Sequence, residues 1–374
     1  MIARIKFRRR KVRYAVIGAG HIAQAAVLPA FAHAGRNSEL VALVSGDEKK
    51  RRELSRRYRL RKAYPYEAYE ECLRNGEVDA VYIALPNDMH REYAVRAARA
   101  GVHVLCEKPL ALDEDECRHM IETAEAAGVK LMTAYRLHFE RANLEAVEVV
   151  RSGQIGEARF FSSTFSFPVK DEKNIRLSAA RGGGPLYDIG VYCINAARYL
   201  FRDEPTEVLG FAENGGERRF REVDEATAAV LRFPDARLAT FVSSFGAADT
   251  DEFRIVGTEG VLCVERSFEY TEGITHRLTV GGKTKTRTFP KRDQFAPELL
   301  YFSDCILAGK EPEPSGAEGL ADVRVIRAID ESIRTGRSVF LPAFHRRKRP
   351  SMRQEIARPP VRERPQVKVR PASE

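Results

Sequence analysis

A glycine-rich turn after a short apolar segment constrains the fold of this chain more than any other feature. Residues 13–17 are apolar enough to form a buried strand, and the sequence GAGHIA occupies 18–23. Where such a turn joins a strand to a helix, Gly18 permits the tight turn and Gly20 lets the backbone approach a pyrophosphate, while Ala23 allows close packing of helix on strand. The sequence therefore predicts a dinucleotide-binding site at this turn.

Segments of strand and helix character alternate from here to residue 134. The expected strands are 13–17, 40–45, 78–85, 102–106 and 130–134, and the expected helices are 21–34, 48–58, 88–100 and 113–127. Asp113 is a suitable N-cap for the last of these helices, and Gly128 lies just past its end. This alternation predicts a parallel sheet covered on both faces, a doubly wound Rossmann domain of the α/β class over residues 13–134.

The pattern changes after about residue 135. Strand-like runs then succeed one another at 157–167, 206–213, 226–233, 237–245, 252–257 and 260–266, and helices are expected at 140–151, 184–201 and 318–335. This succession predicts an α+β domain over residues 135–345 that binds substrate, with an open, mostly antiparallel sheet. Because an open sheet leaves one face uncovered, we expect a homodimer or homotetramer.

The net charge of +9 comes from the two ends of the chain. A basic segment spans residues 1–12, and residues 346–374 contain ten basic and three acidic side chains, five prolines and no periodicity. We expect this tail to be disordered. Residues 14–345 carry a net charge of −5, which argues against a nucleic-acid-binding core.

Cysteine usage and hydropathy limit the compartment and the class of protein. The six cysteines show neither a CxxC pair nor metal-ligand spacing, so no metal is expected. A reducing compartment, the cytoplasm, fits best. No uninterrupted apolar run reaches the length of about 18 residues that a membrane span needs, so we expect no membrane partner.

Cofactor choice depends on the residues just after the second expected strand. An NAD site usually places a carboxylate there to hold the ribose 2′-hydroxyl. This strand instead ends in Ser45 and Gly46, with the cations of residues 49–52 just behind. A hydroxyl and several cations suit a 2′-phosphate, so NADP is expected over NAD. Asp47 is the residue that favours NAD, and part of the charged helix 48–58 is simply solvated.

Several expected strands end in residues that could meet a ligand, since doubly wound sheets bind ligands at the carboxyl ends of their strands. Leu85, Pro86 and Asn87 lie at the end of one such strand, and Glu107 and Lys108 lie at the end of another. We therefore expect Lys108 to face the cofactor crevice.

A second motif, GGGPLYDIGVY at 182–192, lies in the second domain. Asp188 and Tyr192 are four residues apart, so a helix that starts near Pro185 places both on one face. The alternative is a glycine-rich loop in which the aspartate only caps structure.

Four motifs together resemble the Gfo/Idh/MocA oxidoreductases. They are GAGHIA at 18–23, ALPNDMH at 84–90, EKP at 107–109 and GGGPLYDIGVY at 182–192. Their order and spacing match over roughly residues 12–342. Within this family the chain is similar to the branch of glucose–fructose oxidoreductase and NADP-dependent sugar dehydrogenases.

The resemblance implies a role for each matched residue. Lys108 would be the catalytic lysine beside the nicotinamide, Asp188 would orient the sugar, and Tyr192 would be the acid/base. The residues expected to bind the cofactor are Gly18, Gly20, His21, Ile22, Ser45, Gly46, Lys50, Arg51, Leu85, Pro86, Asn87, His90, Glu107, Lys108, Arg136 and Arg176. Asn87 and His90 would line the nicotinamide side, and Ser45 and Lys50 the 2′-phosphate.

The chemistry of these residue types suits carbinol oxidation. A free tyrosine, with a pKa of about 10, is a poor base at neutral pH, and a nearby ammonium such as that of Lys108 favours a phenolate. Three readings remain open. The first is a sugar or polyol dehydrogenase that exchanges NADP freely, the second a glucose–fructose-type enzyme that retains it, and the third a non-catalytic NADP sensor. The resemblance implies that glucose–fructose oxidoreductase clamps its NADP with a long N-terminal arm ahead of the first strand. Because only about a dozen residues, many of them basic, precede that strand here, we expect free exchange of NADP.

Overall fold

Six parallel strands form the sheet of the first domain, in the order β3-β2-β1-β4-β5-β6. The computed structural model describes residues 10–346 and 348–369. The strands are β1 (Val12–Ile17), β2 (Ser38–Val44), β3 (Lys62–Tyr64), β4 (Ala80–Ile83), β5 (His103–Cys106) and β6 (Leu131–Thr133). The strand order reverses between β1 and β4, so the carboxyl ends of these strands open a crevice of the kind that binds dinucleotides. The predicted α/β class is confirmed.

Helices cover this sheet on both faces, as the alternating pattern predicts. They are α1 (Leu28–Ala34), α2 (Glu48–Tyr58), α3 (Tyr69–Arg74), α4 (His90–Arg99) and α5 (Glu114–Ala126). Tyr14 and Val16 of β1 pack in the core that contains α1, whereas Ala15 and Ile17 pack in the core that contains α4 and α5. Asp113 caps α5 by accepting a hydrogen bond from the Glu116 backbone N–H at 2.8 Å.

The second domain is built on a nine-stranded sheet, in the order β14-β13-β12-β11-β7-β10-β9-β8-β15. Its strands are β7 (Ala158–Ser166), β8 (Glu207–Glu213), β9 (Ala226–Phe233), β10 (Arg237–Ser244), β11 (Thr250–Gly257), β12 (Gly260–Glu265), β13 (Ile274–Val280), β14 (Lys283–Phe289) and β15 (Val339–Phe340). Only β7 and β10 pair in parallel, so the predicted open, mostly antiparallel sheet is confirmed.

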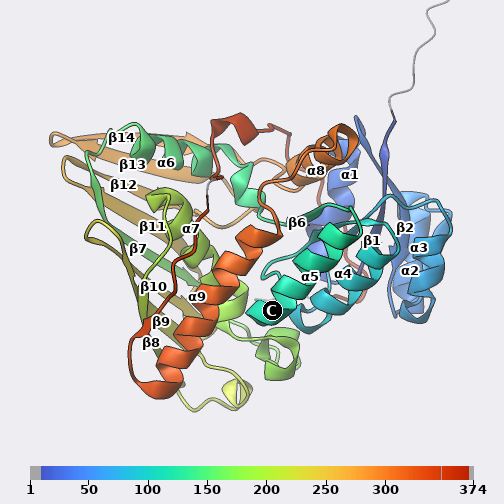
Figure 1. The fold of residues 1–374 in the computed structure, drawn as a ribbon, viewed down its shortest axis with the longest axis horizontal. Coiled ribbons are helices and arrows are strands. Elements are labelled where there is room, and N and C mark those ends of the chain that lie inside the picture. The colour runs from blue at the N-terminus through green and yellow to red at the C-terminus, as the bar shows by residue number, and fades with distance from the viewer. Residues whose placement is uncertain (1–9, 347, 370–374) are drawn as a thin grey trace, which may run out of the picture.

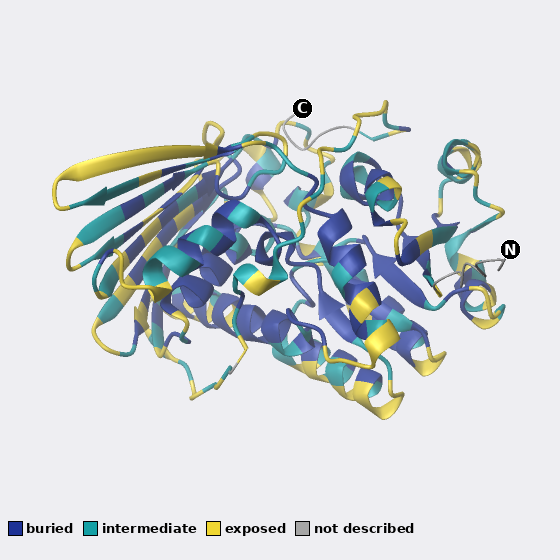
Figure 2. Ribbon diagram, turned by 90° about the horizontal axis from the view of Figure 1, so that it is seen from above, coloured by how far each residue is buried: buried dark blue, intermediate teal, exposed yellow. Residues whose placement is uncertain are grey.

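One face of this sheet packs against helices and the other is open (Figures 1 and 2). The helices that come after the first domain are α6 (Arg141–Arg151), α7 (Val191–Phe201), α8 (Ala296–Ala308) and α9 (Gly316–Thr335). Of these, α8 packs on the Rossmann sheet, where Tyr14 contacts Ser303 at 2.8 Å. Side chains on the open face are exposed and apolar, namely Phe160, Phe211, Val230, Leu238, Val242 and Phe340.

For residues 346 and 348–369 the structure corrects the prediction of a disordered tail over 346–374, and residues 347 and 370–374 lie outside the described part of the chain. Residues 348–369 pack along the molecule, and the side chain of Val367 is buried. Arg349 pairs with Glu204 at 2.7 Å, and Arg346, at the start of the tail, pairs with Glu313 at 2.6 Å. The tail has almost no helix or strand, so its sequence shows no period. Its partners are scattered acids and backbone groups of the core.

Five of the six cysteines are buried, the sixth is half-buried, and all six are free thiols. Among the described residues, no helix is both long enough and apolar enough to cross a membrane.

A buried arginine connects α7 to α9. The fully buried side chain of Arg198 donates to Glu204 at 2.6 Å, to Glu318 at 2.9 Å and to Asp322 at 2.6 Å. All three carboxylates are themselves buried. Charges buried this deeply are tolerated only when each is paired.

We expect Arg198→Met to lower the free energy of unfolding by about 3–5 kcal/mol, because it leaves the buried Asp322 without its cation. Glu204 and Glu318 each lose one of two cations and keep Arg349 and Arg346. Urea unfolding monitored by circular dichroism measures this loss. Arg232→Met is the matched control, since Arg232 pairs with Glu207 at 2.7 Å on the surface and should change stability little. Equal losses in the two variants would contradict a special role for the buried network.

Candidate active site

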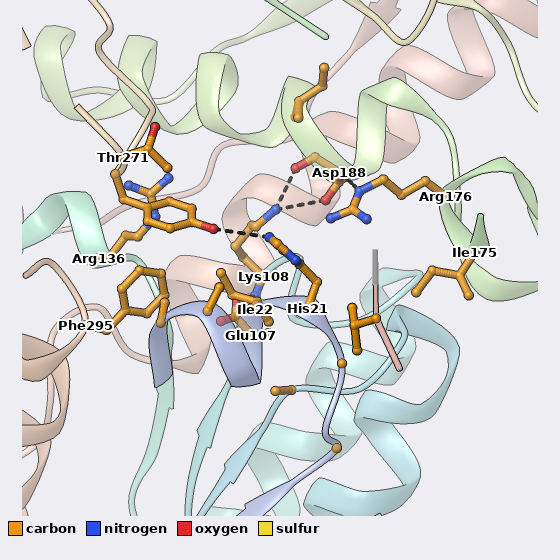
Figure 3. Close-up of a pocket in the computed structure, with 18 of the residues that line it drawn as sticks. His21, Ile22, Glu107, Lys108, Arg136, Ile175, Arg176, Asp188, Thr271 and Phe295 are labelled. Atoms are coloured by element: carbon orange, nitrogen blue, oxygen red, sulfur yellow. Dashed lines mark hydrogen bonds and ion pairs between the residues drawn. The ribbon is translucent and has the colours of Figure 1, made fainter. Parts of the chain in front are cut away.

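A cavity of about 1560 Å³ lies where the carboxyl ends of β1, β2, β4 and β5 meet the second domain (Figure 3). Most of the residues that the sequence assigns to the site line it. They are Gly18, Gly20, His21, Ile22, Ser45, Gly46, Lys50, Leu85, Pro86, Asn87, Glu107, Lys108, Arg136, Arg176, Asp188 and Tyr192. Residues more than 170 positions apart therefore meet in one cavity.

The glycine-rich turn leaves space for a phosphate group. Gly18 has φ of +98°, and a Cβ there would lie 2.3 Å from the carbonyl oxygen of Ala84, so only glycine fits. A Cβ on Gly20 would meet no atom within 4 Å, so the start of the helix is open on that side. Ser45 and Lys50 lie further along the same cavity. The residues present thus fit a dinucleotide, with backbone N–H groups for a pyrophosphate and a hydroxyl and an amine for a ribose phosphate.

Lys108 and Asp188 form a contact between the two domains (Figure 3). The Lys108 ammonium donates to the backbone oxygen of Asp188 at 2.6 Å and to its carboxylate at 3.2 Å. Arg176 donates to the other carboxylate oxygen at 2.6 Å. Burial would raise the pKa of Asp188, but Arg176 and Lys108 outweigh it and hold that pKa well below the usual range. The carboxylate therefore stays ionised at any working pH.

Lys108 stays charged for related reasons. Burial lowers its pKa, but Tyr192, Asp188 and Glu107 together outweigh burial and raise the pKa above the usual value for lysine. Glu107 is itself held in place, because the Tyr82 hydroxyl donates to it at 2.8 Å. The EKP motif thus places the charged Lys108 ammonium in the cavity, where it is held by Asp188.

Tyr192 lies between two cations and two aromatic rings. The Lys108 ammonium is 4.6 Å from the centre of the Tyr192 ring, so it contacts the ring face rather than the hydroxyl. Arg136 donates to the phenol oxygen at 3.3 Å. The rings of Phe165 and Phe268 pack against the phenol at 5.7 and 5.9 Å between centroids. Arg136, expected only as a cofactor residue, therefore donates directly to the Tyr192 oxygen.

A π-helical turn, Leu186–Gly190, carries Asp188 into α7. Such turns are rare and frequently mark functional sites. At the start of the same motif, the Asn87 amide of the first domain donates to the Gly182 carbonyl at 2.8 Å. The glycine-rich motif is thus more than the capped loop considered as its alternative, because Lys108 and Asn87 both bind it.

Two expected cofactor residues do not line the cavity. His90 is fully buried, and its ring nitrogens lie 3.0 Å from the Leu85 oxygen and 2.9 Å from the Pro109 oxygen. His90 lies in the first turn of α4, and its buried ring connects the loop after β4, at Leu85, to the loop after β5, at Pro109. Arg51 donates to the Ser45 backbone oxygen at 2.5 Å and so supports that loop from behind.

Sequence reasoning missed one carboxylate of the cavity wall. Asp251 is buried and lines the cavity, and its two carboxylate oxygens accept no hydrogen bond from any described residue. Burial, and then the nearby Glu269, raise its pKa to about 8. The only sequence signal for its burial is the alternation of buried and exposed residues along β11, in which Asp251 lies on the same buried face as Phe253. Among the described residues, no cluster of three or more potential ligands could hold a metal ion.

Comparison with known proteins agrees with this geometry. Residues 12–135 match the model of an oxidoreductase family with an NAD-binding Rossmann fold, and residues 143–263 match the GFO/IDH/MocA C-terminal domain. The D-xylose 1-dehydrogenase [NADP(+)] of Haloarcula marismortui is 32% identical over 336 residues, which are 88% of this chain and 93% of that protein.

Two solved structures are also similar. The aldose–aldose oxidoreductase from Caulobacter crescentus, complexed with glycerol, has a TM-score of 0.85 and 38% identity, and the match covers 89% of this chain and all of that one. KijD10, a 3-ketoreductase from Actinomadura kijaniata in complex with NADP and TDP-benzene, has a TM-score of 0.80 and 28% identity, over 86% and 98% of the two chains. The family resemblance inferred from the motifs is confirmed, and the chain belongs to the Gfo/Idh/MocA oxidoreductases as an NAD(P)-dependent enzyme.

Proposed function

We propose that this enzyme transfers hydride between a carbinol of a sugar or cyclic polyol and the nicotinamide of NADP. The observation that carries the proposal is the meeting of Lys108, Arg136, Asp188 and Tyr192 in the cavity beside the glycine-rich turn. The NADP dependence of the xylose dehydrogenase and the aldose substrates of the Caulobacter enzyme support the same cofactor and substrate class.

Each residue of the cluster has a chemical task in carbinol oxidation. The glycine-rich turn, Ser45 and Lys50 would hold the NADP, whose nicotinamide would supply the acceptor for the hydride of the carbinol carbon. The Tyr192 oxygen takes the hydroxyl proton, and the Arg136 guanidinium stabilises the negative charge of the phenolate that does so. The Lys108 ammonium lies beside Asp188 and completes the positive field around the reacting oxygen. Asp188 holds a sugar hydroxyl and fixes the position of the reacting carbon.

A retained-cofactor reaction between two sugars is the second candidate. The similarity to an aldose–aldose oxidoreductase favours it, because such a reaction reduces one sugar with the hydride of another. The third reading, a non-catalytic sensor, is not favoured, since the four residues that catalysis needs are assembled in one cavity.

We also propose that the open face of the second sheet forms a homodimer or homotetramer. The exposed apolar residues of this face lie on neighbouring strands, where Leu238 is paired with Phe160 across β10 and β7. A contiguous apolar patch on a sheet face favours association with a second copy.

We expect Tyr192→Phe to lower kcat by roughly 10²- to 10⁴-fold, because it removes the group that takes the proton. Steady-state kinetics across pH on the best sugar of a panel measures the loss. Binding of NADPH should stay near wild type, which titration of NADPH fluorescence verifies. A variant with near wild-type kcat would mean that the base lies elsewhere.

Lys108→Met should abolish turnover and leave NADP binding measurable. The variant keeps the volume of the side chain but removes the ammonium that Asp188 and Tyr192 contact. Calorimetric titration with NADP gives the affinity, and sugar oxidation gives the rate. Lost binding with retained turnover would overturn the assignment.

Asp251→Asn should stabilise the protein more at pH 9 than at pH 5. The folded pKa of Asp251 is about 8, above the usual value near 4 for an unfolded chain. Between these values the unfolded state gives up its proton while the folded state keeps it, so this carboxyl lowers stability as pH rises. Asparagine removes this dependence. Thermal unfolding at both pH values measures the difference, and an equal shift at both would refute the raised pKa.

A further inference from the structure

The C-terminal tail forms one wall of the cofactor cavity. Val361, Glu363, Arg364, Gln366 and Lys368 line the same cavity as the glycine-rich turn and the end of β2. In a Rossmann domain the residues after the second strand face the ribose of the adenosine half. The tail comes after β15, the last strand of the second domain, yet it returns to the first domain and passes the adenosine end of the cavity.

Specific contacts hold the tail against the start of the first helical segment. Gln24 and Val367 form a reciprocal pair, in which the Gln24 amide donates to the Val367 oxygen at 3.1 Å and the Val367 N–H donates to the Gln24 oxygen at 2.8 Å. The Val367 side chain is buried in the core that contains α1. Gln366 lies 3.0 Å from the His21 ring nitrogen, directly at the turn that faces the pyrophosphate.

The tail also neutralises the acid that argues for NAD. One Asp47 oxygen caps α2 by accepting from the Lys50 backbone N–H at 2.9 Å, and the other pairs with the Lys368 ammonium at 2.8 Å. The Lys368 contact, and then the Lys50 N–H, lower the pKa of Asp47 to about 2. Both carboxylate oxygens are thus engaged, one by the helix cap and one by an ammonium.

We propose that residues 361–368 are a strap across the adenosine end of the cofactor cavity, and that Lys368 sets the preference for NADP over NAD by neutralising Asp47. This rests on the proposed function only in taking a nicotinamide dinucleotide as the ligand of the cavity. An unpaired carboxylate just past a strand end would repel a 2′-phosphate. With Lys368 in place the same corner presents Ser45, Lys50 and a second ammonium.

The strap also slows cofactor release. Its contacts with His21, Gln24 and Asp47 must separate before the adenosine end of the cavity opens fully, and Val367 must leave the core. The expectation of free exchange, which considered only the N-terminal segment, is therefore replaced by exchange limited by opening of this strap. Residues 1–9 lie outside the described part of the chain.

Binding measurements on full-length variants test the proposal. The chain contains no tryptophan, so the emission of NADPH and NADH reports binding, and stopped-flow chase with excess NADP reports dissociation. Lys368→Ala should weaken NADPH binding by about tenfold or more while NADH binding holds or improves. Deletion of 361–374 should add about tenfold faster NADPH dissociation. Arg353→Glu, a charge reversal at an exposed tail position outside the cavity, and deletion of 370–374 are the controls.

A double variant separates neutralisation from a direct contact. If Lys368 acts through Asp47, then Asp47→Asn combined with Lys368→Ala restores the NADPH preference, since asparagine still caps α2. Failure to restore it would overturn the neutralisation step. Unchanged affinity ratios and dissociation rates, within about twofold, in both Lys368→Ala and the 361–374 deletion would overturn the strap. If the wild-type protein binds neither NADPH nor NADH, the proposed function fails instead.

Discussion

The contact between the Lys108 ammonium and Asp188 is the interaction on which the active site depends, because it joins the two domains at the cavity. Lys108 lies at the end of β5, whereas Asp188 belongs to the π-helical turn before α7, so neither domain forms the cluster alone. Both groups are largely removed from water, where each charge requires the other. Arg176 supplies a second cation to the same carboxylate. The site is therefore an ion cluster that exists only when the domains are docked.

This arrangement changes how the tyrosine is understood. A lysine beside a tyrosine suggests a direct ammonium–phenol contact, but Lys108 lies over the ring face and Arg136 reaches the oxygen. Arginine keeps its charge at every working pH, so the positive field at the phenol oxygen does not titrate with the rest of the site. Lys108 binds Asp188, while Arg136 donates to the phenol oxygen. The sequence assigns the contact with the phenol to Lys108 alone.

The sequence predicted the central elements well because each had a periodic apolar face and a clear boundary. The predicted strand 226–233 coincides with β9, and helix 48–58 coincides with α2. Several elements without such a face were missed, and so was the largely buried α8. Strand β14 is exposed and polar on nearly every residue, and β3 has only three residues. Among site residues, motif position identified Lys108 but not that His90 points into the protein, since orientation depends on contacts across loops that no local pattern records.

The tail shows most clearly where composition misleads. Many basic residues and prolines without periodicity predict disorder when the charges are assumed to face water. In the folded chain the acids of the core are their partners: Arg346 pairs with Glu318, Arg349 with Glu204 and Lys368 with Asp47. The mildly acidic core and the basic tail are thus complementary parts of one fold. Prolines lower the cost of ordering such a segment, because they restrict the unfolded chain. Three basic side chains of the tail pair with acids of the core, and the last of them, Lys368, lies at the cofactor cavity beside Asp47.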